Sequence, residues 1–277
     1  MLAHLIQSLE PGLPIYVFLL ALPVAIFLRY LFYAGGALAI TSLLKRRLRP
    51  RRLQPFPFTR HQLFREAAYS ALTACIFAVV GVAAFVLNNQ FGVFRFYKDI
   101  DAYGWIWFVA SIPAGLLIHD FYFYWMHRLI HLPGIYKRVH AVHHLSTNPS
   151  PLSAFAFHPL EAVLEAFGYL IVLVLIPVHP IAFAIFSTFT ITYNVIGHLG
   201  YEIYPSWLIR TPLKQIANTP TSHNQHHRTF NYNFGLYTLI WDHFFGTLHP
   251  RYSETFAAAT RPALQTAPST ANTKEST

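Results

Sequence analysis

The stretch "WIWFVASIPAGLLIHDFYFYWMHRLIH", residues 105–131, joins two kinds of sequence in one continuous run. Its first half is apolar enough to enter a bilayer, which takes about 20 helical residues to cross. Its second half carries His119, His127 and His131, and the last two are four residues apart. Side chains four residues apart lie on the same face of a helix. The stretch therefore predicts a membrane helix that leads into a histidine-rich site.

The composition indicates an integral membrane protein. Of 277 residues, 54% are hydrophobic and only 11% are charged, whereas a soluble domain carries about 25% charged residues. Further apolar runs cover residues 14–44, 67–87 and 162–197. The last is interrupted at "IPVHP", where two prolines predict a hairpin of two helices. We expect an all-α membrane protein with about four to five transmembrane or membrane-embedded helices and a cytosolic, histidine-rich helical cap.

The same pattern predicts one membrane-embedded domain over residues 1–262, with its histidine-rich core at about 100–250. Residues 263–277 are polar and rich in Thr, which is typical of a disordered tail without chemistry.

The net charge of +9 is unevenly distributed along the chain. Basic residues concentrate between Lys45 and Arg65, directly after an apolar run, and no nucleic-acid-binding module accompanies them. We therefore expect no nucleic-acid partner. Basic loops beside membrane spans are typically cytoplasmic. If this loop is cytoplasmic, the order of spans brings all the clustered histidines to the cytoplasmic side.

Two short motifs repeat one histidine spacing. "VHAVHHLS" (139–146) and "SHNQHHRT" (222–229) each place a second histidine three residues, and a third four residues, after the first. On a helix this spacing lets two rings bind one metal ion while the third reaches a neighbouring ion. With "HRLIH" (127–131), the three motifs hold too many histidines for one tetrahedral ion and suit two ions. Because Cys75 is the only cysteine, the ligands must be nitrogen or oxygen atoms.

The segments "HDFYFYWMHRLIH", "VHAVHHLS" and "SHNQHHRTFNYNFGLYTLIWDHFFGT" resemble the signature of the fatty acid hydroxylase and sterol desaturase superfamily. The resemblance extends over about residues 70–250. It implies a non-haem di-iron centre in a cytosolic cap and O2-dependent hydroxylation or desaturation of a membrane lipid. It also implies these ligands: His127, His131, His140, His143, His144, His198, His223, His226 and His227. Some relatives carry one more histidine where this chain has Asn194, so His119 or water is a candidate replacement.

Each ligating imidazole needs an acceptor for its second N–H group. Carboxylates near the motifs are the candidates, and they are Asp120, Glu161, Glu202 and Asp242. Tyr124 is a candidate hydrogen-bond donor near the metal ions, with an interfacial aromatic role as its alternative.

The reaction would need electrons from outside the chain. Neither a GxGxxG nucleotide motif nor a recognisable haem domain is present in the sequence, so we expect a separate cytosolic electron-transfer protein. Arg128, Lys137 and Arg138 are basic residues near the motifs that could attract an acidic donor. An apolar tunnel for the lipid is expected between helices near 105–118 and 162–197.

Two other functions remain open at the level of sequence. A membrane zinc-dependent lipid hydrolase would use the same ligands, and zinc is also expected to occupy such a site in purified samples. It would however need a general base, and no HExxH motif occurs. A divalent metal transporter would instead place its ligands through the depth of the membrane, at helix breaks.

Overall fold

The computed structural model describes residues 15–261, and within them the chain is helical, with isolated β-bridges but no β-strand. The prediction of a disordered tail at 263–277 concerns residues outside this range. The longer helices are α2 (Ile15–Leu43), α4 (Arg60–Phe91), α5 (Gly104–Ile130), α7 (Pro159–Leu175), α8 (Pro180–Gly197) and α9 (Pro220–Thr229). Shorter helical segments are α3 (Lys45–Leu48), η1 (Arg49–Arg51), η2 (Ile100–Ala102), α6 (Tyr136–Val139), η3 (His143–Leu145), η4 (Pro151–Phe155), η5 (Ser206–Arg210), η6 (Pro212–Gln215), α10 (Ile240–Phe244) and α11 (Tyr252–Thr260).

Four of the described helices are long and apolar enough to cross a membrane: α2, α4, α5 and α8. Together with the apolar helix α7 they account for the membrane-embedded helices expected from the sequence. The prediction of an all-α integral membrane protein is confirmed.

Both helices of the hairpin, α7 and α8, begin with the same dipeptide. His158–Pro159 opens α7 and His179–Pro180 opens α8, with the histidine side chain accepting a backbone N–H two residues later. Proline suits the first helical position because its missing N–H has no partner there in any helix. The break at "IPVHP" is therefore a helix start, and it separates two helices as predicted.

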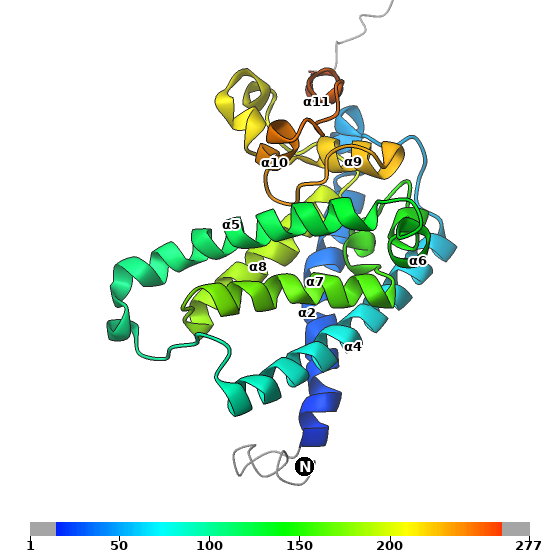
Figure 1. The fold of residues 1–277 in the computed structure, drawn as a ribbon. Coiled ribbons are helices and arrows are strands. Elements are labelled where there is room, and N and C mark those ends of the chain that lie inside the picture. The colour runs from blue at the N-terminus through cyan, green and yellow to red at the C-terminus, as the bar shows by residue number, and fades with distance from the viewer. Residues whose placement is uncertain (1–14, 262–277) are drawn as a thin grey trace, which may run out of the picture.

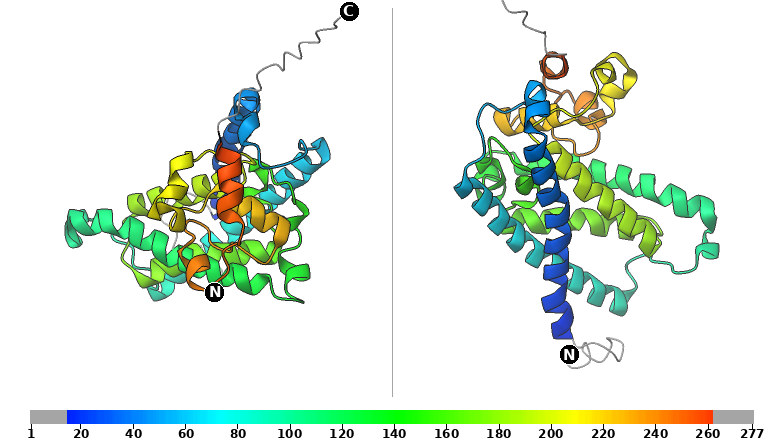
Figure 2. Two further views of the ribbon diagram at one scale, coloured as in Figure 1. Left: turned by 90° about the horizontal axis from the view of Figure 1, so that it is seen from above. Right: turned by 180° about the vertical axis from the view of Figure 1, so that it is seen from behind.

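The long helices form a bundle with the short helices at one end. In Figure 1, α5, α7 and α8 run alongside one another, α2 passes behind them, α4 runs obliquely below α7, and α9, α10 and α11 gather at the end opposite the start of α2. Figure 2 shows the same separation from behind, with α11 beside the far end of α2. The segments that follow α8 thus gather at this end, where α11 also contacts η1.

A buried carboxylate anchors the loop that follows the second histidine motif. Glu66, inside α4, accepts hydrogen bonds from Ser146 at 2.7 Å and from Gln62 at 2.8 Å, and a further one from Ser150. Buried carboxylates cost free energy unless they are hydrogen-bonded, and here three donors meet that need. The contact holds residues 146–150 against α4 and thereby fixes where the motif ends.

Candidate metal centre

Four segments of the chain bring nine histidines together in two groups. The end of α5 supplies His127 and His131, and the residue after α8 is His198. The other two segments are the turns around η3, with His140, His143 and His144, and helix α9, with His223, His226 and His227.

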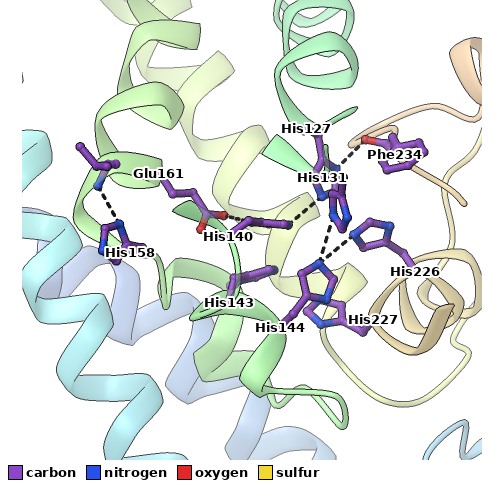
Figure 3. A network of polar contacts seen from close by, with 12 residues as sticks. His127, His131, His140, His143, His144, His158, Glu161, His226, His227 and Phe234 are labelled. Carbon is purple, nitrogen blue, oxygen red and sulfur yellow. Dashed lines mark hydrogen bonds and ion pairs between the residues drawn. The ribbon is translucent and has the colours of Figure 1, made fainter. Parts of the chain in front are cut away.

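The first group contains five imidazoles whose candidate donor atoms all lie within 4.8 Å of one another. Nε2 of His127 lies 3.1 Å from Nε2 of His140, and Nε2 of His144 lies 3.2 Å from that of His131. Nε2 of His226 lies 3.1 Å from that of His144. Figure 3 shows these five rings turned toward one another from α5, the η3 turns and α9.

The second group contains four imidazoles under the same 4.8 Å limit. Nε2 of His198 lies 3.0 Å from that of His223, 3.3 Å from that of His227 and 3.5 Å from that of His143. Nε2 atoms of His223 and His227 are 3.1 Å apart. The two groups adjoin, because the rings of His144 and His227 have centroids 4.7 Å apart.

Each repeated motif divides its histidines between the two groups in the same way. His140 and His144, four residues apart, belong to the first group, while His143 belongs to the second. In α9 the pair His223 and His227 belongs to the second group and His226 to the first. The spacing therefore does what the sequence suggested: the outer two rings meet at one centre and the middle ring reaches the other.

The motif at residues 139–146 divides its histidines in this way without the regular helix that its spacing suggested. His140 follows the one-turn helix α6, and His143 and His144 begin the 3-10 turn η3. Of the two repeated motifs, only the one in α9 presents its histidines from a continuous α-helix. A 3-10 turn is tighter than an α-helix, and short turns of this kind are common connectors.

Hydrogen bonds donated by Nδ1 fix the orientation of several rings. Nδ1 of His127 donates to the carbonyl of Phe234 at 2.9 Å, and Nδ1 of His140 donates to Glu161 at 2.6 Å. An uncharged imidazole with its proton on Nδ1 has only a lone pair on Nε2. The Nε2 atoms of His127 and His140 lie 3.1 Å apart. With a lone pair on each, they cannot hydrogen-bond to each other. A cation held between them removes this conflict, so the donor set fits metal ions.

Two further rings are oriented by backbone carbonyls. Nδ1 of His198 donates to the carbonyl of Asn194 at 2.7 Å, and Nδ1 of His226 donates to that of Tyr232 at 2.7 Å. In both cases Nε2 points into its group. Such outer contacts fix the tautomer of a metal-binding histidine.

Burial keeps these imidazoles uncharged. It lowers the pKa of His198 to about 4, below the ordinary value of 6.5. Burial, reinforced by neighbouring imidazoles, also lowers the pKa of each of His140, His143, His144, His223 and His227 well below the ordinary value. Neutral imidazole is the form that binds metal ions.

One of the four candidate carboxylates hydrogen-bonds directly to a clustered histidine, and the other three have different partners. Glu161 accepts from His140, as Figure 3 shows. Asp120 accepts from the backbone N–H of Tyr237 and from the side chains of Thr238 and Trp241.

Glu202 and Asp242 act on the backbone. Glu202 accepts from the N–H and hydroxyl of Thr221 and so caps the start of α9. Asp242 accepts from the N–H groups of Phe234 and Gly235 at 2.8 Å each, and burial raises its pKa to about 6. It therefore positions the loop whose carbonyl receives His127.

The remaining candidates lie outside both groups. His119 is buried, but Nδ1 contacts the hydroxyl of Tyr237 at 2.9 Å and its ring lies against Tyr169 and Phe186. The side-chain amide of Asn194 donates to the carbonyl of Ala154.

Tyr124 likewise contacts none of the nine histidines through its hydroxyl. That hydroxyl lies 3.0 Å from Oγ1 of Thr247, which in turn donates to Asp242. Tyr124 thus joins α5 to the segment after α10, which Asp242 also contacts through Thr247.

Sequence reasoning missed the backbone acceptors at Asn194, Tyr232 and Phe234. Every residue has a carbonyl, so no sequence signal identifies these three. The neighbouring Gly235 has a structural reason, because a Cβ there would lie 2.2 Å from the carbonyl oxygen of Thr238 and 3.0 Å from Oδ2 of Asp242.

An apolar groove lies on the outer face of α5 and α7. It has a volume of about 760 Å³ and is lined by residues that include Phe121, Trp125, Met126, Leu164 and Trp241. Met126 directly precedes His127 in α5. On α7 the groove falls within the 162–197 wall expected from the sequence, whereas on α5 it is lined from Leu117 to Leu129, mostly beyond the expected 105–118 wall.

Comparison with known proteins agrees with this arrangement. The model of the fatty acid hydroxylase family matches residues 112–247. A Delta(7)-sterol 5(6)-desaturase of Gibberella zeae is 31% identical over 71% of this chain and 59% of its own length. Lathosterol oxidase of Mus musculus is 29% identical over 70% of this chain and 64% of its own length. The chain thus spans about three fifths of the length of these relatives, and no solved structure matches it.

The fold and the site together define a class of protein: helical integral membrane proteins with two adjoining histidine groups. The chain belongs to the fatty acid hydroxylase and sterol desaturase superfamily.

Proposed function

We propose that this protein catalyses O2-dependent hydroxylation or desaturation of a membrane lipid at a non-haem di-iron centre. The observation that carries the proposal is the convergence of nine histidines into two adjoining groups. Imidazole is a good ligand for iron, and two groups of this size suit two ions.

The proposed ligands divide as the groups do. One ion would be held by His127, His131, His140, His144 and His226, and the other by His143, His198, His223 and His227. Bound iron supplies the oxidant, derived from O2, that breaks an unactivated C–H bond, which no side chain can do. We do not assign His119 or the side chain of Asn194 to either ion, because both face other partners.

The protein residues orient the ligands and exclude water. Glu161 and the carbonyls of Phe234 and Tyr232 hold imidazoles through Nδ1. Aromatic rings cover the groups, with Phe157 against His143 and Phe230 against His144, at centroid distances of 5.3 Å and 4.7 Å. A dry site keeps a reactive oxidant from being consumed by water.

A lipid substrate is supported by the membrane helices, by the apolar groove and by relatives whose names refer to sterols. We propose that a sterol or another apolar lipid passes from the bilayer along the groove between α5 and α7. The carbonyl oxygen of Leu164, at the side of this groove, is already used by the hydroxyl of Tyr122. The groove thus offers mostly apolar contacts, which suit a hydrocarbon surface.

We propose a cytoplasmic location for the centre, supported by the basic segment between Lys45 and Arg65 at the end of α2. A separate cytosolic electron-transfer protein would deliver electrons near α6. There Lys137 and Arg138 are exposed, between His131 and His140 in the sequence. Zinc would compete for the same imidazoles during purification.

The test is lipid profiling of cells with and without the full chain, grown under ¹⁸O2. Hydroxylation would give a lipid heavier by one labelled oxygen, and desaturation a lipid lighter by two hydrogens. Both products should vanish in the His143→Ala variant. A lipid product that forms equally well without O2 would refute the proposal in favour of a zinc hydrolase. Metal uptake into proteoliposomes without any lipid product would refute it in favour of a transporter.

A further inference from the structure

A second, separate cavity lies where α2 ends. It has a volume of about 340 Å³, and four basic side chains line it: Lys45, Arg46, Arg49 and Arg52. We call it the basic pocket. Figure 1 places this end of α2 at the same end of the molecule as α9 and α11, and Figure 2 shows it from behind. Pockets of this size accommodate small ligands or headgroups.

Among the described residues, the four cations of the basic pocket have no ion-pair partner. Within residues 15–261, none of them forms an ion pair or a side-chain hydrogen bond. Neighbouring Arg51 behaves differently, because its guanidinium donates to the carbonyls of Glu202 at 3.3 Å and Tyr204 at 2.9 Å. Like charges gathered around one cavity repel one another, and a bound anion would relieve this repulsion.

The floor of the basic pocket is fixed by backbone contacts. The N–H of Leu53 donates to the carbonyl of Gly200 at 3.0 Å, and Arg52 pairs with Tyr201 in an isolated antiparallel bridge. Gly200 has a φ of +71°, and a Cβ there would lie 2.5 Å from Oε1 of the buried Gln54. Arg49 and Arg52 thus project from a defined scaffold that joins residues 49–54 to the segment after His198, while Lys45 and Arg46 lie in α3.

The position of the basic pocket favours a membrane ligand. The apolar span Leu20–Leu43 ends two residues before Lys45, and Leu43 is 83% exposed. Ser42, an exposed residue, also lines the pocket. A lipid whose phosphate enters the pocket could keep its acyl chains beside Leu43. An acidic protein would need a broad open surface, whereas this site is a recess.

We propose that the basic pocket binds the phosphate headgroup of an anionic membrane phospholipid. Arginine guanidinium groups bind phosphate through paired, charge-assisted hydrogen bonds. The lipid would stabilise the contact between the end of α2 and residues 200–202, which lead from His198 to the helix-capping Glu202.

The experiment uses the full chain in detergent micelles that contain either dioleoylphosphatidylserine or dioleoylphosphatidylcholine, with lipid occupancy read by native mass spectrometry. We expect at least tenfold tighter binding of phosphatidylserine by the wild-type protein. The Arg46→Gln/Arg49→Gln variant should lose about tenfold in that affinity. The matched Arg47→Gln/Arg60→Gln variant removes the same charge from residues that do not line the pocket, and it should bind within twofold of wild type.

Three results would overturn the proposal. Equal losses in the two double variants would mean a general surface potential and no specific pocket. Full displacement of phosphatidylserine by millimolar inorganic phosphate would identify a soluble anion as the ligand, and displacement by polyglutamate would identify an acidic protein. The phosphate and polyglutamate arms use the wild-type protein, so they decide the matter even if a variant fails to fold.

Discussion

Nδ1 of His140 donates a 2.6 Å hydrogen bond to Glu161, and both side chains are almost completely buried. The contact joins α7 to the second histidine motif and fixes which ring nitrogen of His140 faces the first group. Among the described residues, Glu161 is the carboxylate that holds a clustered imidazole. It is therefore a positioning residue for the proposed metal centre.

Replacing Glu161 with Ala should weaken iron retention by about 10- to 100-fold, the usual effect of removing such an outer partner. Iron content during dialysis against a chelator would measure this, together with turnover. Glu161→Gln should retain more iron, because its amide oxygen can still accept from Nδ1. The control is Glu165→Gln, at a buried carboxylate one turn along α7 that hydrogen-bonds to none of the nine histidines in the described residues. Equal iron retention in Glu161→Ala and wild type would contradict this role.

Single histidine replacements should affect the two proposed ions unequally. His143→Ala leaves three imidazoles in the four-membered group, whereas His226→Ala leaves four in the five-membered group. We expect His143→Ala to retain about one iron per chain and His226→Ala to retain more, with turnover lost in both. Elemental analysis of purified variants measures this. His243→Ala, at an exposed histidine in α10, should match wild type. Identical iron content in the two cluster variants would contradict the division into groups.

Acid should destabilise the metal-free protein. Burial lowers the pKa of His198 to about 4 in the folded chain, whereas the unfolded chain has a pKa near 6.5. Between these pH values the unfolded state binds the proton and the folded state does not. The free energy of unfolding therefore has its full value, as far as His198 contributes, above pH about 6.5, and it decreases as the pH falls toward about 4. This residue alone accounts for a loss on the order of 3 kcal/mol.

The buried neighbours His143, His223 and His227 shift in the same direction. Buried carboxylates act in the opposite direction, because burial raises the pKa of Asp242 to about 6 and also raises the pKa of Glu202, and both shifts favour the folded state as the pH falls. The buried imidazoles with a lowered pKa are more numerous. Thermal unfolding of the chelator-treated protein from pH 7.5 to 5 should therefore show a falling Tm. A constant or rising Tm would show that the imidazoles are accessible to protons in the folded state.

The helices and the histidine motifs were predictable from sequence because both are local patterns. Hydropathy locates α2, α4, α5 and α8, and the spacing within each motif determines which rings meet. His119 shows where such reasoning fails. It precedes His127 by eight residues, about 80° around a helix of 3.6 residues per turn, so it faces α7 and α8 and not the metal site.

Long-range partners were not predictable. Glu161 and Asp120 are both carboxylates close to histidines in the sequence, yet only Glu161 reaches an imidazole, because the packing of α7 against the second motif decides the contact. The carbonyls of Asn194, Tyr232 and Phe234 could not be singled out, because hydrogen bonding through the backbone leaves no trace in residue type.

Asp242→Asn should loosen the loop that holds His127. Oδ1 of Asp242 accepts from the N–H of Phe234 and the hydroxyl of Thr247, and Oδ2 accepts from the N–H of Gly235. An amide keeps one oxygen and turns an NH2 group toward a remaining donor, which costs about 1–3 kcal/mol for an unsatisfied buried group. We expect a lower Tm and weaker iron retention, because the carbonyl of Phe234 orients His127.

The control is Asp101→Asn, at an exposed carboxylate in η2, which should leave both the Tm and the iron retention unchanged. A variant with lower Tm and normal iron would limit Asp242 to a role in folding.

Electron delivery should depend on the exposed cations of α6. Lys137 and Arg138 lie in the segment between His131 and His140, so an acidic donor attracted there would approach the first histidine group. Removing both charges in Lys137→Gln/Arg138→Gln should lower kcat/KM for the donor about tenfold at low ionic strength. The deficit should shrink in 0.5 M salt, where the screening length falls to a few Å.

The control Arg210→Gln/Lys214→Gln removes the same charge from η5 and η6 and should leave the rate within twofold of wild type. Turnover driven by a small chemical reductant should be the same in all three proteins, since no docking is then required. A deficit that persists with the chemical reductant, or that does not change with salt, would place the effect of Lys137 and Arg138 in the histidine site itself.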